Sequence, residues 1–294
     1  GTVSDAEERS DKDRSGLLVP ALALFLWVLV AGVWERCDHS VLPPVELPPR
    51  LQDASLPDFG AIDDVGRKKQ AFFEFLLPLV DARNAWIQDN RAFLQRLRDR
   101  IVAGAPLTDA ELARLAVLAD RYEVAFADAG DLDAFDLLLF RADVIPPSLA
   151  LAQAAAESGW GTSRFARAGN NLFGEWCFSP GCGIVPGRRR EGATHEVADF
   201  ESVAASLESY FLNLNTHEAY RPVRTLRAQA RRDGRTVRGI ELAAGLLRYS
   251  ERREAYVEEI RTLIRTNDLG QLDGAPMTVA RLEARDDRGA SGAN

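Results

Sequence analysis

The chain has 294 residues, 46% of them hydrophobic, which predicts one or two domains with an ordinary buried core. Its net charge is −8, but residues 144–269 carry 17 arginines, no lysine and 15 acidic residues, a net charge of +2. An excess this small is as consistent with an ordinary mixed surface as with binding of an anionic polymer. It is too weak to indicate a nucleic-acid-binding module.

The first predicted element is an apolar run over residues 17–34 that carries no charge. A helix there spans about 27 Å, close to the ~30 Å hydrocarbon core of a membrane. Three basic residues precede the run between positions 9 and 14, and only Arg36 follows closely. The positive-inside rule therefore predicts a cytoplasmic tail over 1–16, a single-pass inner-membrane anchor over 17–34 and a periplasmic remainder. A cleaved signal peptide and a buried soluble helix are the alternatives.

Residues 35–62, with five prolines between positions 41 and 60, predict an extended linker. The following region, 63–143, is predicted to be helical. Apolar side chains recur at helical spacing from Asp63 onward, a Thr108-x-x-Glu111 capping box starts a second helix that continues to about Tyr122, and a third covers Leu132–Arg141. No catalytic motif occurs in this region.

A short helix, Leu149–Ser158, is apolar on all sides and is therefore predicted to be buried. Its single charged residue is Glu157, in the last turn. Burial and the negative end of the helix dipole both raise the pKa of such a carboxyl, so that it can act as a proton donor, as glycosidases require. The alternative is a structural ion pair. Trp160, between two glycines, is expected to form a sugar-binding wall or part of the apolar pocket around the acid.

A further short helix is expected over Ser163–Ala168, and residues 174–200 predict a small irregular hairpin because of their turn signals. Within the hairpin, a Pro-Gly turn can bring Cys177 and Cys182 together as a disulfide, although two free thiols remain the alternative. Four more helices are expected at about 202–215, 221–232, 237–248 and 251–267, followed by a disordered tail over 270–294. Arginines that recur every three or four residues from 221 to 238 are read as a solvated face, or else as a surface that attracts carboxylates.

Two runs, Ala152–Ser163 and Gly169–Gly174, resemble the glucosaminidase family of bacterial peptidoglycan hydrolases. Trp176–Cys182, Leu212–His217 and Tyr249–Arg252 look like the Bax-type branch of that family, which is unrelated to the apoptosis regulator of that name. The resemblance implies a mainly α (α+β) protein. Its catalytic domain, over 144–269, would be lysozyme-like and helical with a small β-hairpin lobe, preceded by helices and the N-terminal transmembrane helix.

By this resemblance Glu157 is the general acid that cleaves the β-1,4 bond after N-acetylglucosamine in peptidoglycan glycan strands. Tyr220 occupies the place of an aromatic residue that lines the cleft, and Phe173 is a buried support. Asn170 and Asn171 are candidate positioners of backbone or sugar, with turn formation as the alternative. Together with Trp160, these four are the predicted substrate-binding residues.

The second carboxylate is expected in the hairpin, with Glu191 and Glu196 as first candidates and Glu175 as the third. A retaining pair stands about 5–5.5 Å apart and an inverting pair about 6.5–9.5 Å apart, whereas catalysis assisted by the 2-acetamido group needs only the acid.

No cofactor and no metal are predicted, because His39, His195 and His217 lack ligand spacing. Cys177 or Cys182 with His195 is only a weak match to a thiol protease. Two rivals remain: a non-catalytic glycan-binding scaffold of the envelope, and a lytic transglycosylase, which also needs a single acid.

Overall fold

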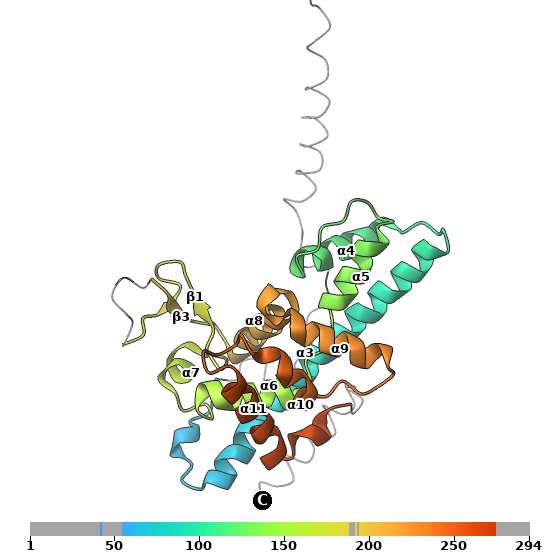
Figure 1. Cartoon of the computed structure of the whole chain (residues 1–294). Helices are drawn as coiled ribbons and strands as arrows, with labels where there is room; N and C mark the ends of the chain where they lie inside the picture. Colours follow the sequence, from blue (N-terminus) through green and yellow to red (C-terminus); the bar gives the residue numbers. More distant parts are fainter. Residues whose placement is uncertain (1–41, 43–54, 188–191, 193, 275–294) are drawn as a thin grey trace, which may run out of the picture.

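The computed structural model describes residues 42, 55–187, 192 and 194–274. The predicted anchor over 17–34 lies outside these residues, as does Glu191. The described chain is mainly helical with one small sheet, which fits the expected architecture (Figure 1). Within it, no helix combines the length and the apolar character that crossing a membrane requires.

One long helix, α3 (Val65–Val102), contains 38 residues and so extends about 57 Å. It runs from near α7 (Arg164–Gly169) to the end of the molecule where α4 (Asp109–Arg121) and α5 (Leu132–Arg141) pack (Figure 1). The three helices predicted for 63–143 are thus present. The capping box is also present, because the Thr108 side chain accepts a hydrogen bond from the Glu111 amide and the Glu111 carboxylate accepts one from the Thr108 amide.

The packed structure begins earlier than the sequence suggests. Phe59, in the short helix η2 (Phe59–Ala61), is 1% exposed, and its ring lies 5.4 Å from that of Phe72 on α3. The extended linker predicted for residues 35–62 is therefore wrong for this last part, since the apolar ring is buried against the long helix.

The helix that carries Glu157, α6 (Pro147–Ser158), lies at the centre of the molecule, as its composition predicts. It packs against α3, α10 (Gly239–Leu242), α11 (Glu254–Thr266) and η5 (Leu269–Leu272). Its N-terminus has no side-chain cap of its own. Instead, the Asp273 carboxylate accepts hydrogen bonds from the Ser148 amide at 3.1 Å and the Ser148 hydroxyl at 2.6 Å. The prediction of disorder from residue 270 is therefore wrong for residues 270–273.

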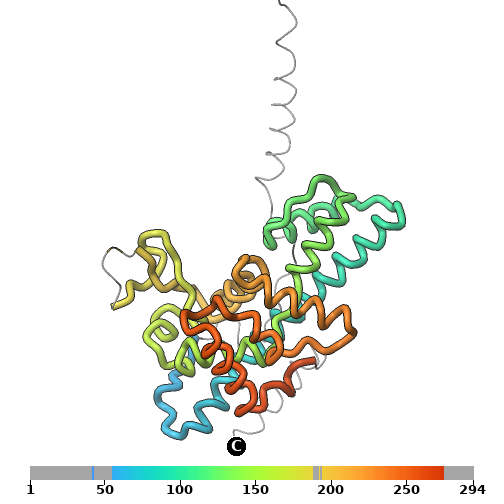
Figure 2. The backbone as a smooth tube through the Cα atoms, in the orientation of Figure 1, coloured from blue at the N-terminus to red at the C-terminus, as the bar shows by residue number. Residues whose placement is uncertain are grey.

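The predicted hairpin is a three-stranded lobe of β1 (Trp176–Cys177), β2 (Gly183–Ile184) and β3 (Glu196–Ala198). The strands are antiparallel in the order β1-β3-β2, with Trp176 opposite Val197 and Gly183 opposite Ala198. Cys177 and Cys182 form a disulfide with their Cα atoms 6.1 Å apart. Figure 2 shows the lobe on one side of the central helices and the α4–α5 region on the other.

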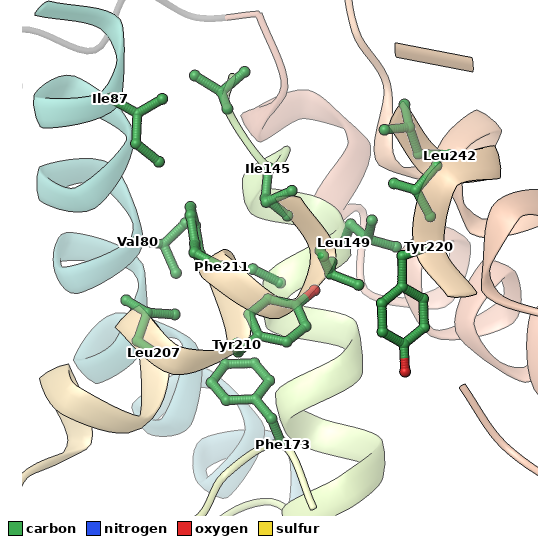
Figure 3. Packing of buried hydrophobic residues seen from close by; sticks show 14 of the residues in the cluster. Val80, Ile87, Ile145, Leu149, Phe173, Leu207, Tyr210, Phe211, Tyr220 and Leu242 are labelled. Atoms are coloured by element: carbon green, nitrogen blue, oxygen red, sulfur yellow. The ribbon is translucent and has the colours of Figure 1, made fainter. Parts of the chain in front are cut away.

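The remaining helices, α8 (Val203–Thr216), α9 (Arg221–Arg232) and the short η3 (Glu218–Tyr220) and η4 (Ala243–Leu246), complete the core. In Figure 3 the Phe173 ring lies against that of Tyr210 on α8, with 3.9 Å between the ring centroids. Phe173 is 1% exposed, so it is buried as the resemblance implies.

A buried charge cluster joins α3, α5 and α9. Asp143 is 2% exposed and accepts hydrogen bonds from Arg231, while Arg91 and Arg227 lie 3.7 Å from its carboxylate. Arg227 is itself 1% exposed and donates to the backbone carbonyls of Asp143 and Val144. The solvated arginine face predicted for 221–238 is therefore wrong at Arg227, because its guanidinium satisfies carbonyl groups in the core.

Candidate active site

A cleft of about 930 Å³ lies between the end of α6, the β lobe, α8 and the segment that precedes α11. Its walls include four glutamates, together with Trp176, Tyr220 and Arg252. The glutamates are Glu123, Glu157, Glu175 and Glu251. Its volume falls within the ~300–1,000 Å³ range usual for ligand sites. Glycosidic bond hydrolysis commonly uses a pair of carboxyl groups, so the glutamates of this cleft are candidates for that chemistry.

Glu157 ends α6, where Gly159 adopts a left-handed conformation that terminates the helix. Burial raises the pKa of Glu157, while a hydrogen bond with Tyr256 and the positive charge of Arg252 partly offset that rise. The backbone passes close to the acid at Gly174, whose φ is +67°. A Cβ atom at that position would lie 3.1 Å from Glu157 Oε2, so glycine leaves room for the carboxyl group.

Glu175 immediately precedes β1 and faces the same cleft. Asn213 on α8 donates a hydrogen bond to its Oε1 at 3.2 Å, whereas Oε2 is buried and has no hydrogen-bond partner among the described residues. Burial raises the pKa of Glu175 to about 7, and the nearby Ser209 and Asn213 only partly oppose it. This carboxyl therefore holds a proton close to neutral pH.

Asn171 acts on the backbone that carries Glu175. Its side-chain oxygen accepts a hydrogen bond from the Glu175 amide, and its nitrogen donates to the carbonyls of Glu175 and Ala198. Asn170 has a φ of +50° and donates to the Phe200 carbonyl. Neither asparagine lines the cleft, so their amide groups contact backbone, as one form of the prediction has it, and not sugar.

Trp160 does not line the cleft either. Its ring packs edge-on against Phe72 and Phe73 of α3 at centroid distances of 5.9 and 5.3 Å. The prediction that Trp160 forms a sugar-binding wall is therefore wrong. Its indole packs against the long helix α3 instead.

The structure changes the order of the candidates for the second carboxylate. Glu196 is 8% exposed and does not line the cleft; its carboxylate accepts hydrogen bonds from the amides of Gly181, inside the disulfide loop, and Gly183, directly after it. Glu191 lies outside the described residues. Glu175, the third candidate in the sequence, is the hairpin-region glutamate that the structure places beside Glu157 in the cleft.

Two tyrosines, Tyr220 and Tyr249, line the cleft, and Tyr256 hydrogen-bonds the acid from behind them. Tyr220, predicted to line the cleft, does so, and burial together with the charges of Glu175 and Glu157 raises its pKa to about 12. Tyr249 lies 5.6 Å from Tyr220 and stacks on Tyr256 at 5.5 Å. Sequence reasoning gave Tyr249 and Tyr256 no role, and only the Tyr249–Arg252 run pointed to this segment.

A mainly helical domain with glutamates on one cleft fits the class of glycan-cleaving hydrolases that comparison with known proteins suggests. The family model described as mannosyl-glycoprotein endo-beta-N-acetylglucosaminidase matches residues 138–269. The chain belongs to this glucosaminidase-domain family, in its Bax-type branch. It is 35% identical over 205 residues to Protein bax of Escherichia coli (strain K12), covering 70% of this chain and 72% of that protein. No solved structure matches the chain significantly.

Proposed function

We propose that this protein is a peptidoglycan hydrolase that cleaves the β-1,4 bond after N-acetylglucosamine, with Glu157 as the general acid. The family suggests a glycan-cleaving hydrolase, and the pairing of Glu157 with Glu175 on one cleft carries the proposal further. Both carboxyls have a raised pKa, which suits proton transfer near neutral pH.

In the proposed reaction Glu157 donates its proton to the leaving-group oxygen as the glycosidic bond breaks. Tyr256 and Arg252 hold its carboxyl in place and stabilise the carboxylate that remains. Ionised Glu175 then either accepts a proton from the attacking water or stabilises the positive charge that develops on the sugar ring. We also propose that residues 17–34 anchor the protein in the inner membrane with the catalytic part in the periplasm, where the Cys177–Cys182 disulfide would persist.

The test is digestion of purified sacculi by the full chain in mild detergent, followed by mass spectrometry of the released ends. Reducing N-acetylglucosamine ends are expected. Anhydro-sugar ends would instead identify a lytic transglycosylase, and binding without cleavage would leave a glycan-binding scaffold.

We expect kcat/KM to fall as the pH rises through about 7. The active form has Glu157 protonated and Glu175 ionised, so the two carboxyls together hold one proton. Glu175, with a pKa of about 7, sets the pH above which that last proton is lost from the pair. Glu175→Gln should therefore lower kcat by at least about 100-fold and remove the fall in activity near pH 7.

The matched control is Glu123→Gln, because Glu123 also lines the cleft but its side chain is 69% exposed. It should keep the parent's rate and pH profile. Glu175→Gln with parent-like kcat would show that no second carboxylate is needed there, as in catalysis assisted by the substrate's own acetamido group.

A further inference from the structure

We propose that Trp176 and Phe178 form a sugar-stacking platform, on which one N-acetylhexosamine ring of the glycan strand rests through its apolar face. The platform rests on the proposed function and adds to it the place where the substrate is gripped. Three observations support this proposal: the exposure of the two rings, the cleft that they share with the glutamates, and the contacts that fix the β lobe.

Both aromatic side chains are largely exposed to solvent. Trp176 is 57% exposed and Phe178 is 71% exposed. Every other large hydrophobic side chain with comparable exposure among the described residues is aliphatic. Trp176 and Phe178 line the same cleft as Glu157 and Glu175, so the exposed aromatic surface continues the proposed catalytic site.

One face of the Trp176 indole is covered by a neighbouring ring. The His195 imidazole stacks on it with 4.2 Å between centroids and 11° between planes. Because Trp176 pairs with Val197, His195, the residue directly before β3, is its diagonal neighbour and lies within reach of an aromatic side chain. The stacking fixes the orientation of the indole, and the exposure of the residue leaves its other face free for a ligand.

The lobe beneath the platform is held by two independent constraints. The Cys177–Cys182 disulfide closes the loop directly after Trp176. The buried Glu196 carboxylate accepts hydrogen bonds from the Gly181 amide at 3.1 Å and the Gly183 amide at 2.9 Å, inside and next to that loop. A platform fixed before binding loses little conformational freedom when the ligand arrives, which favours affinity.

The chemistry of the platform selects a pyranose ring. One face of such a ring presents C–H groups that pack on an aromatic face, while its hydroxyl and acetamido groups remain free to meet polar groups across the cleft. Trp176 follows Glu175 directly, so the stacked ring would lie next to the bond that the glutamates act on.

The experiment compares binding of soluble, peptide-free glycan strands by isothermal titration calorimetry in a Glu157→Gln background, which prevents turnover. Adding Trp176→Ala is expected to weaken binding roughly tenfold, or about 1.4 kcal/mol. Trp176→Phe, which keeps a flat ring, should lose less than about threefold. Val185→Ala is the control, because Val185 lies on the same lobe, is 50% exposed and does not line the cleft.

In the active chain Trp176→Ala should raise KM with little change in kcat, since the platform grips the ground state and the transition state alike. Equal affinity of the parent and Trp176→Ala would overturn the platform while leaving the hydrolase intact. A parent that neither binds nor cleaves glycan would instead refute the proposed function. A melting temperature within a few degrees of the parent's shows that the variant is folded.

Discussion

Replacing Glu157 with glutamine is expected to lower kcat for glycan hydrolysis by roughly 10²–10⁴-fold. Glutamine keeps the shape of the side chain at the end of α6 but has no proton to donate to the leaving-group oxygen. Because the cleft wall is otherwise unchanged, glycan binding should remain within about threefold of the parent. The measurement is the rate at which reducing ends appear from sacculi, paired with a binding titration.

Glu251→Gln makes the same chemical change at an exposed glutamate of the same cleft, and it should leave the rate unaltered. If Glu157→Gln turned over at the parent's rate, the proton would have to come from another group, and Glu175, with its pKa of about 7, would be the first candidate.

Asp143→Asn is expected to remove about 3–5 kcal/mol of the free energy of unfolding, because it leaves the buried guanidinium of Arg227 without its counter-charge. Burial alone would raise the pKa of Asp143, but Arg227, Arg231 and Arg91 hold it below its ordinary value. The carboxylate thus stabilises the fold above the unfolded-state pKa of about 3.9, and this contribution is lost as the pH falls through the lower folded-state pKa. Urea denaturation at pH 7 measures the loss.

The control is Asp136→Asn, which breaks the exposed Arg98–Asp136 pair, and it should change stability by no more than about 1 kcal/mol. A loss below about 1 kcal/mol in Asp143→Asn would mean that Arg227 is neutralised by other groups.

The helices could be predicted because their signals are local. The capping box at Thr108 and the apolar run before Glu157 each specify their element within a few residues, and α4, α5 and α6 appear where expected. The same locality explains the position of Glu157 beside a cleft. Because the helix is buried and its single carboxyl stands in the last turn, that carboxyl can reach a cleft only where the helix ends.

What could not be predicted depends on partners far apart in the sequence. Nothing near Glu175 shows that α8 places Asn213 against it, or that Glu196 turns toward the disulfide loop instead of the cleft. Trp160 was predicted to form a sugar-binding wall because the rings that pack against its indole, Phe72 and Phe73, lie on another helix far away in the sequence. Arg227 looked solvated because the carbonyls that it binds follow α5.

The length of α3 determines how the molecule holds together. This single helix contacts α5 as well as α6 and α8, so the region before residue 144 and the region that bears the glutamates share one apolar interior. Removing the residues before 138 would leave α6 without the helix that packs on it and would separate it from Phe72 and Leu76, both fully buried. We therefore expect the family-matched segment, residues 138–269, to be less stable without α3.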